Sequence, residues 1–321
     1  MYCIDAGSIY CPCHLAETHD CILCSQLSGE EFCQCKDWCG VCIYEKYISN
    51  GKKPTKLRKT YMATVFKKER TEDSLYILTL KAPESLVKEL VYPGSFIFLK
   101  NIKLPTYYNV PISIMEADMY KSTIKVAIKE NGIKTKNILK LNANEKISAR
   151  GPFYNGIMGL SNIKKAKNGT SLIIARGIGI APSINVIKKL SSNNNKIISI
   201  LDTEFKDNFG KQYFDQCNSE IINSSILYNG ELTENFKSTL SKIISENNIN
   251  VIYCGGPDIL IYKILKFIDK SINFSCCNNA KMNCGEGICA SCTKHYKNDV
   301  VKRLCKVQMD PRDLFKDRRF I

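Results

Sequence analysis

The sequence predicts a protein of several domains, in which an antiparallel β-barrel precedes an α/β domain with a parallel sheet. Short β-rich runs separated by turn residues fill the region from about residue 61. Strands alternate with helices after residue 170. Of the 17 cysteines, nine lie in residues 3–42 and eight lie from residue 217 onward. The expected units are a cysteine-rich metal-binding module (1–48), a basic linker (49–60), the barrel (61–163), the α/β domain (164–272) and a small C-terminal cluster-binding segment (273–321).

Composition narrows the class of protein. With 321 residues and 44% apolar side chains, the chain has room for two or three domains with real cores. Its formal charge of +15 is spread along the whole sequence without a nucleic-acid-binding motif, so we expect no nucleic-acid partner. No apolar run approaches the roughly 18 residues that span a bilayer, and the start lacks a secretion-signal pattern. We therefore expect a cytoplasmic protein with no membrane span and no disulfide framework.

The N-terminal module contains two cysteine pairs whose spacing suits a metal. Cys21 and Cys24, and likewise Cys39 and Cys42, are separated by two residues, which is the bite of a tetrahedral zinc site. Nine thiols can equally hold two four-iron clusters with one left over. About 45 residues bury little apolar surface, so we expect the module to fold around its metal, with zinc and iron–sulfur both open.

The central region divides into two patterns of secondary structure. The barrel is predicted from β-rich runs at 61–66, 75–80, 96–99 and 123–128. The α/β domain is predicted from strands at 171–175, 196–201 and 251–253, with helices at about 182–190, 234–246 and 258–269. The linker before them is polar and basic, with turn residues Gly51 and Pro54.

A glycine turn joins the first α/β strand to its helix. It reads Arg-Gly-Ile-Gly-Ile-Ala-Pro over residues 176–182. Glycines at such a turn let a ligand approach the backbone, and the free amides of the helix N-terminus accept a phosphate. The turn alone is weak evidence, but its place after a strand strengthens it. The candidate nucleotide-binding residues are Gly177, Gly179, Ala181 and Pro182.

Four cysteines near the C-terminus have the spacing of an iron–sulfur site. Cys284 and Cys289 are separated by four residues, Cys289 and Cys292 by two, and twelve residues follow before Cys305. Zinc sites prefer two close ligand pairs, whereas a four-residue gap followed by a two-residue gap is typical of plant-type 2Fe-2S ferredoxins. The sequence therefore predicts that these four thiolates hold a 2Fe-2S cluster and that the chain moves electrons.

Together these motifs resemble the flavin and nicotinamide oxidoreductases of the ferredoxin reductase superfamily, over about residues 60–321. Within that superfamily the chain is similar to the electron-transfer subunits of dihydroorotate dehydrogenase and the small subunits of sulfide dehydrogenase. The resemblance implies FAD contacts at the family's Arg-Pro-Ile-Ser stretch, its Gly-Thr pair and its Gly-Pro segment. In this sequence these positions are Val110, Pro111, Ile112 and Ser113, then Lys134 and Thr135, and then Gly151 and Pro152. It also places the nicotinamide site at the glycine turn and at Cys254 and Gly255.

The sequence departs from the family pattern at three places. Val110 stands where the family has the arginine that contacts the flavin, and Arg176 replaces a glycine of the nucleotide turn. The family's Cys-Gly-Pro is one residue longer here, over 254–257. Two interpretations of Cys254 remain open: its thiol lies beside the nicotinamide, or it packs at the end of a strand.

The resemblance implies a function in electron transfer. The expected cofactors are FAD, NAD(P)H and a 2Fe-2S cluster, with a catalytic partner subunit or a ferredoxin-like redox protein as the partner. No acid–base side chain is needed, because the chemistry belongs to the cofactors. Two alternatives stay open. One is an authentic dihydroorotate dehydrogenase electron-transfer subunit, and the other is a non-catalytic protein whose metal centres sense the redox state without turnover. Neither the choice between NAD and NADP nor the direction of electron flow follows from the sequence.

Overall fold

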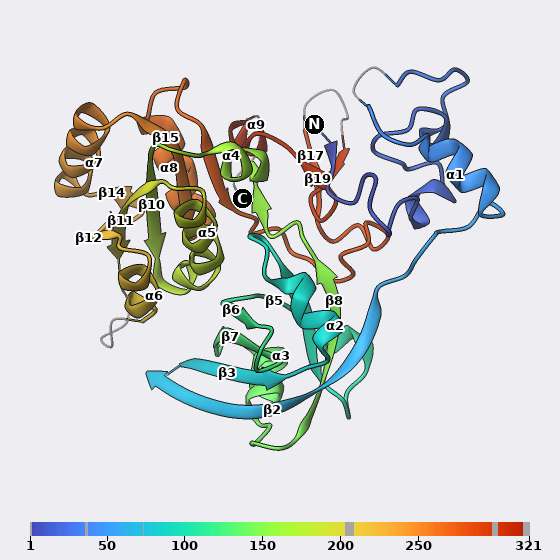
Figure 1. The fold of residues 1–321 in the computed structure, drawn as a ribbon, viewed down its shortest axis with the longest axis horizontal. Helices are drawn as coiled ribbons and strands as arrows, with labels where there is room; N and C mark the ends of the chain where they lie inside the picture. The colour runs from blue at the N-terminus through green and yellow to red at the C-terminus, as the bar shows by residue number, and fades with distance from the viewer. Residues whose placement is uncertain (1, 36–37, 73, 203–208, 297–300, 317–321) are drawn as a thin grey trace.

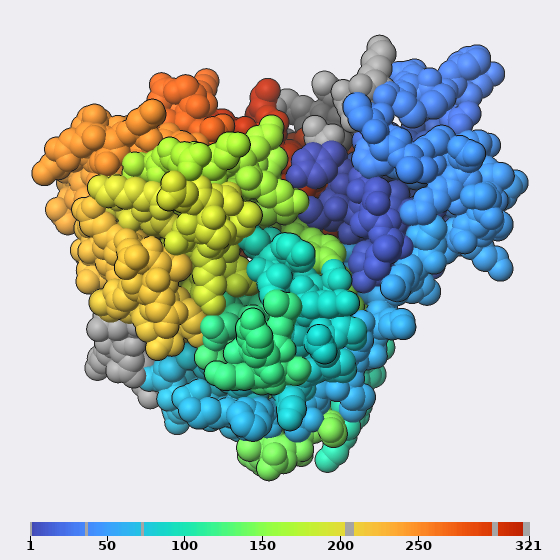
Figure 2. All heavy atoms as spheres, viewed as in Figure 1, coloured from blue at the N-terminus to red at the C-terminus, as the bar shows by residue number. Residues whose placement is uncertain are grey.

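The computed structural model describes residues 2–35, 38–72, 74–202, 209–296 and 301–316 (Figure 1). A curled antiparallel sheet forms one part, a parallel-sheet domain forms a second, and the N-terminal module lies beside the C-terminal segment. The module stands out from the rest of the molecule as a separate lobe, drawn in blue in Figure 2. Because β1 pairs with β19, residues near the two ends of the chain meet.

The antiparallel sheet has seven strands in the order β5-β4-β8-β2-β3-β7-β6. Its edge strands, β5 and β6, follow each other in the chain with only Ile114 and Met115 between them, so the sheet must curl to bring its edges together. The expected barrel is therefore a curled half-barrel, in which hydrogen-bonded pairing of the described strands is open at one seam. The strands are β2 (Lys59–Glu72), β3 (Leu75–Lys81), β4 (Phe96–Asn101), β5 (Val110–Ser113), β6 (Glu116–Asp118), β7 (Thr123–Lys129) and β8 (Lys146–Phe153).

Every second side chain along these strands points into the half-barrel, and these apolar side chains form its core. Leu78 and Leu80 on β3, Ile97 and Leu99 on β4, and Val126 on β7 are almost fully buried. Short helices lie in the connections between these strands: α2 (Glu84–Val87), η3 (Lys88–Leu90), η4 (Thr106–Tyr108) and α3 (Ile133–Leu139).

The second sheet has the order β12-β11-β10-β15-β16-β9, and all of its neighbours are parallel except the antiparallel edge strand β9. The chain builds outward from β10 through β11 to β12, then returns to β15 on the other side of β10. The strands are β9 (Ile157–Met158), β10 (Thr170–Arg176), β11 (Lys196–Asp202), β12 (Glu220–Asn223), β15 (Ile249–Gly255) and β16 (Phe274–Cys277). The associated helices are α4 (Leu160–Lys165), η5 (Gly177–Gly179), α5 (Ile180–Ser192), α6 (Lys211–Gln216), α7 (Glu234–Glu246) and α8 (Asp258–Phe267).

This strand order creates a switch point between β10 and β15, where successive connections leave in opposite directions. Ligands of open α/β sheets bind outside the carboxyl ends of the strands at such a point. Buried aliphatic residues on both faces of β10, such as Ile173 and Ile174, fix its central place in the sheet. The fold thus presents the end of β10, and the glycine turn that follows it, to a ligand.

Small elements connect the two ends of the chain. The N-terminal module contains β1 (Tyr2–Cys3), η1 (His14–Ala16), η2 (Gln26–Ser28) and α1 (Ile43–Ser49). The C-terminal segment contains β17 (Thr293–His295), β18 (Val301–Arg303), β19 (Val307–Gln308) and α9 (Pro311–Phe315), and a hairpin of β13 (Leu227–Tyr228) and β14 (Glu231–Leu232) precedes α7. None of the helices in the described ranges is both long and apolar enough to cross a membrane.

Candidate functional site

A cavity of about 850 Å³ lies where the half-barrel, the parallel sheet and the cysteine-bearing C-terminal segment meet. Its walls come from the β4–β5 connection with β5, from β7 to α3, from the glycine turn, and from the ends of β15 and β16. Among the predicted residues, the cavity is lined by Val110, Pro111, Ile112, Ser113, Lys134, Thr135, Gly177, Gly179, Ala181 and Pro182. The residues predicted to contact the flavin and those predicted to bind the nucleotide therefore line the same cavity.

The glycine turn requires its glycines because two backbone segments touch there. A Cβ on Gly179 would lie 2.4 Å from the carbonyl carbon and oxygen of Gly255, and a Cβ on Gly255 would lie 2.4 Å from the oxygen of Gly179. Gly177 has a φ of +55°, which disfavours other residues. No side chain caps the start of α5, although the Ile180 amide bonds back to the Gly177 carbonyl, so the partial positive charge of the helix N-terminus lies beside the cavity. Gly255 thus packs against the backbone of the turn but does not line the cavity.

The cavity wall carries positive charge. Lys129, Lys134 and Arg176 line it, and none of the described residues that line it is acidic. Lys134 Nζ donates to the carbonyl of Asn109 at 3.4 Å, which holds it beside the stretch that ends in Ser113. Arg176 Nε donates to Asp202 at 3.0 Å, at the end of the neighbouring strand. These cations suit the phosphates of a dinucleotide, and Lys134 supplies charge that Val110 lacks.

The remaining predicted contacts lie outside this cavity wall. Gly151 and Pro152 are buried in β8, and Arg58 Nε donates to the Pro152 carbonyl at 2.6 Å. Gly156, five residues after Gly151, does line the cavity. Cys254 is fully buried in the core of the parallel sheet, where burial raises the pKa of its thiol well above its ordinary value. The structure therefore places Cys254 in packing at the strand end, the second of its two interpretations.

Sequence reasoning missed the residues at the end of β16. Cys277, the last residue of that strand, lines the cavity opposite Gly256 and Pro257, as do Asn278 and Asn279 directly after it. The Cys277 thiol donates to the Gly256 carbonyl at 3.1 Å and accepts from the Gly256 amide at 3.3 Å. The sequence carries only a weak signal for this strand: Phe274-Ser-Cys-Cys follows a helix, where the alternating pattern calls for one more strand, but the run is short.

The four C-terminal cysteines lie close together at the edge of the same cavity. The Cys305 thiol hydrogen-bonds to the thiols of Cys284 and Cys292, which raises the pKa of Cys305 and lowers those of the other two. Cys289 also hydrogen-bonds to Cys284, and the Glu286 amide donates to Cys284 Sγ at 3.3 Å. Asn283, the residue before Cys284, lines the cavity.

The loop between the first two of these cysteines is curled by its glycines. Gly285 and Gly287 have φ values of +72° and +82°. A Cβ on Gly285 would lie 2.4 Å from the Phe153 ring, so the loop also needs glycine there to pack against β8. The four thiols and the inward amide fit the donor set of a 2Fe-2S cluster. No group of three or more His, Cys, Asp or Glu side chains in the described ranges is already arranged to hold a metal ion.

A buried charge cluster of Asp5, Arg58, Glu286 and Lys306 fastens this loop to the N-terminal module. Arg58 Nη2 contacts Asp5 at 2.6 Å and Arg58 Nη1 contacts Glu286 at 2.8 Å. Lys306 Nζ contacts the same two carboxylates at 2.6 and 3.1 Å. The linker was expected to be a polar, basic stretch, yet Arg58 is buried because it neutralises the buried carboxylate of Asp5 and the partly buried carboxylate of Glu286.

The cysteines of the N-terminal module are distributed unevenly. Cys21, with Cys3, Cys11 and Cys13, lines a small internal cavity. Cys24 is buried in the module's core, whereas Cys39 and Cys42 are exposed. Cys33 and Cys35, which are also exposed, have their sulfurs 3.2 Å apart.

The half-barrel, the switch-point sheet and the shared cavity define a fold of the ferredoxin reductase type. The structure is similar to that of an NADH-dependent reduced ferredoxin–NADP oxidoreductase, with a TM-score of 0.63 and 18% identity over 79% of this chain and 92% of the other. It is also similar to ferredoxin–NADP⁺ reductase from Plasmodium falciparum, with a TM-score of 0.51 and 16% identity over 68% and 96% of the two chains. No protein-family model matches the chain.

The sequence relatives are electron transfer subunits of dihydroorotate dehydrogenase B (NAD⁺). The subunit from Clostridium acetobutylicum is 29% identical over 245 residues, which cover 75% of this chain and 91% of the relative. The subunit from Enterococcus faecalis strain V583 is 25% identical over 248 residues, which cover 76% and 91%. The resemblance found from the motifs is thereby confirmed.

Proposed function

We propose that the chain is an electron-transfer oxidoreductase that passes electrons between NAD(P)H, FAD and a 2Fe-2S cluster, and from there to or from a partner. One observation carries the proposal. A single cavity is bounded by the glycine turn, by the β5 strand and by Asn283, the neighbour of the first C-terminal cysteine. Relatives named as electron transfer subunits and as reductases support the same function.

The nucleotide would be held by backbone at the end of β10. Gly177 and Gly179 let its phosphates approach, and the start of α5, which no side chain caps, contributes the partial positive charge of a helix N-terminus. The Ser183 hydroxyl donates to the Gly179 carbonyl at 2.7 Å, which fixes the turn before any ligand arrives. Preorganisation of this kind lowers the entropy cost of binding.

The flavin would lie against β5, with Pro111 to Ser113 along its length and Lys134 near its phosphates. When bound, the flavin supplies the conversion between a two-electron hydride transfer and single-electron steps, which the cluster continues. Ile112 is buried and Val110 and Ser113 are half-buried, so this wall excludes water from one face of the site. No residue of the chain needs to transfer a proton.

Cys284, Cys289, Cys292 and Cys305 would hold the cluster. Glu286 contributes its backbone amide to Cys284 Sγ, and such amide–sulfur hydrogen bonds tune the potential of iron–sulfur centres. Arg150 Nη2 donates to the Cys284 carbonyl at 2.8 Å and anchors the loop to β8. We further propose that a catalytic subunit or a ferredoxin-like protein exchanges electrons with this end of the chain.

Anaerobic purification followed by quantification of flavin, iron and acid-labile sulfide tests the proposal. We expect one FAD per chain, iron and sulfide sufficient for at least one 2Fe-2S cluster, and oxidation of NAD(P)H with an artificial acceptor. Metal without flavin and without turnover would instead indicate the redox-sensing alternative. Co-purification with a dihydroorotate-oxidising subunit would identify the partner.

A further inference from the structure

Four cysteines surround one small cavity inside the N-terminal module. Cys3, Cys11, Cys13 and Cys21 line a space of about 20 Å³, together with apolar residues such as Leu15 and Ile43. Cys11 is buried and the other three are half-buried, and all four carry free thiols. A cavity of this size already has room for one small bound species, and rotation of the thiols would enlarge it.

The module has too little core to fold by packing alone. Its buried apolar cluster consists of Cys11, Ala16, Cys24, Leu27, Ile43 and Tyr47, so two of its six members are cysteines. Over residues 2–35 and 38–48 its regular structure is limited to short 3₁₀ turns, the two-residue strand β1 and most of the seven-residue helix α1. Segments of this size obtain stability from a metal that draws distant parts of the chain together. The four cysteines of the cavity come from sequence positions spread over 19 residues, so a shared metal would close the module.

The cavity adjoins the C-terminal cysteine segment. β1 pairs with β19 in a register that sets Cys3 opposite Val307, two residues after Cys305. Asp5 lines the cavity and binds Lys306, the residue next to Cys305. Asp20 also contacts Arg303 at 3.0 Å, which ties the same module to β18.

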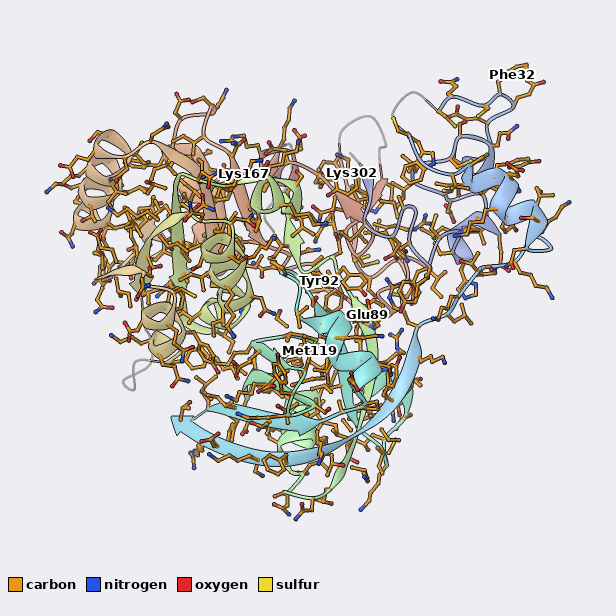
Figure 3. The ribbon with its side chains drawn as sticks, in the orientation of Figure 1. Phe32, Glu89, Tyr92, Met119, Lys167 and Lys302 are labelled. Atoms are coloured by element: carbon orange, nitrogen blue, oxygen red, sulfur yellow. The ribbon has the colours of Figure 1, made fainter. Side chains whose placement is uncertain are left out.

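Buried charges border this cavity on the side marked by Asp5. Lys306 and Arg58, both buried, pair there with Asp5 and also contact Glu286. Four thiolates with a divalent ion would add negative charge beside this cluster. Cys33 and Cys39 are exposed, and Phe32, the residue before Cys33, stands at the outer end of the module, away from the C-terminal segment (Figure 3).

We propose that Cys3, Cys11, Cys13 and Cys21 bind a thiolate-ligated metal centre, either one tetrahedral ion or an iron–sulfur cluster. This ligand set replaces the pairing of Cys21 and Cys24 with Cys39 and Cys42 that spacing suggests. Binding releases the thiol protons and requires no oxidant. The centre is independent of flavin binding, because its ligands and its neighbours lie outside the large cavity.

Metal analysis of matched variants of the full chain tests this ligand set. In the double variant Cys11→Ser and Cys13→Ser we expect loss of one zinc or one iron per chain, or of the iron and sulfide of one cluster. Zinc, iron and acid-labile sulfide are measured together, so the three metal types are distinguished. FAD content and the C-terminal cluster spectrum should stay at the wild-type level, which shows that the rest of the chain folds. A double variant with the full wild-type metal content would overturn the proposal.

Two further measurements separate this site from the others. The variant Cys284→Ser should lose the C-terminal cluster and keep the metal of the N-terminal site; loss of both would contradict an independent centre. On the wild-type chain, alkylation mapped by mass spectrometry before and after chelation needs no variant at all. Cys3, Cys11, Cys13 and Cys21 should become reactive only after chelation, while Cys39 reacts in both states. If the four thiols react equally before and after metal removal, the ligand set is wrong.

Discussion

Lys306 Nζ donates a hydrogen bond to Asp5 Oδ2 at 2.6 Å, across 301 residues of sequence. Both side chains are almost completely buried, and Arg58 and Glu286 complete the cluster. Two positive and two negative charges balance there. This relationship joins the N-terminal module, the linker and the cysteine loop, and it makes the position of the loop depend on the first residues of the chain.

Removal of one charge from this cluster should lower the free energy of unfolding. Lys306→Met keeps much of the side-chain volume but leaves Asp5 with Arg58, and Glu286 with Arg58 and the more distant Arg150. Breaking a buried ion pair costs about 3–5 kcal/mol. We expect a lower denaturation midpoint and faster proteolytic release of the N-terminal module. Lys67→Met is the control, because Lys67 is 60% exposed and its pair with Glu69 lies on the surface. Equal midpoints for the two variants would show that the buried cluster contributes no net stability.

Glu116 should make the contact between the two sheets dependent on pH. Burial alone would raise the pKa of this carboxyl, but Lys125 and Lys188 more than offset that effect and lower it to about 2. Lys125 belongs to β7 and contacts Glu116 at 2.8 Å, and Lys188 belongs to α5 and contacts it at 3.1 Å. Because the folded-state pKa is depressed, the stabilisation is present above the ordinary glutamate pKa and is lost as pH falls toward 2.

Acid unfolding of Glu116→Gln measures this effect. At pH 6 to 7 we expect the variant to be about 1–2 kcal/mol less stable than wild type, after allowance for solvent screening. The difference should shrink as pH falls from about 4.5 toward 2, since the unfolded wild-type chain then takes up a proton at Glu116 while the folded chain still holds the ionised carboxylate. Glu220→Gln, at an exposed pair with Lys196, is the control and should show little change. A constant difference across the pH range would exclude the ionised carboxylate as the cause.

Gly179→Ala should weaken nucleotide binding without removing the flavin. The added Cβ would meet Gly255 backbone at 2.4 Å, and backbone cannot move aside as a flexible side chain can. We expect the KM for NAD(P)H to rise roughly tenfold or more, which corresponds to about 1.4 kcal/mol. Gly230→Ala has open space around its Cβ and adds only local backbone strain, so its KM should match wild type. An unchanged KM in Gly179→Ala would remove the turn from the nucleotide site.

Lys134 should take over part of the role of the arginine that Val110 replaces. Lys134→Ala removes a positive charge from the cavity wall, and we expect FAD to bind roughly tenfold more weakly, as judged by equilibrium dialysis. Lys136→Ala is the matched control, because Lys136 lies on the same helix but is exposed and does not line the cavity. Equal affinities for the two variants would mean that Lys134 does not contact the flavin.

Local patterns predicted much of this fold. β3, β10, β11 and α7 lie where alternation or helical periodicity sets them, because each buries a regular apolar face. Strand β16 was not predicted, because its four residues, two of them cysteines, form too short a pattern. The cavity residues Cys277 and Asn278 were missed for the same reason. Curling of the half-barrel depends on which strands form the edges of the sheet, and no local pattern encodes that.

Long-range contacts explain the other differences. The burial of Arg58 depends on Asp5 and Glu286, which lie 53 and 228 residues away in sequence. The grouping of Cys21 with Cys3 also follows from folding, since the spacing of Cys21 and Cys24 gave the stronger local signal. In contrast, the glycine turn needs only its own strand and helix, so the sequence sufficed to identify it.

The shared cavity predicts that electrons from NAD(P)H reach the C-terminal cysteines through the flavin. Stepwise anaerobic titration with NADH and with NADPH, followed by visible and electron paramagnetic resonance spectra, tests this most directly. We expect the flavin absorbance to bleach and a reduced 2Fe-2S signal to appear in the wild type, whereas the flavin of Cys284→Ser should bleach without that signal. A cluster that stays oxidised while the flavin is reduced, or a purified chain that contains no flavin, would contradict it.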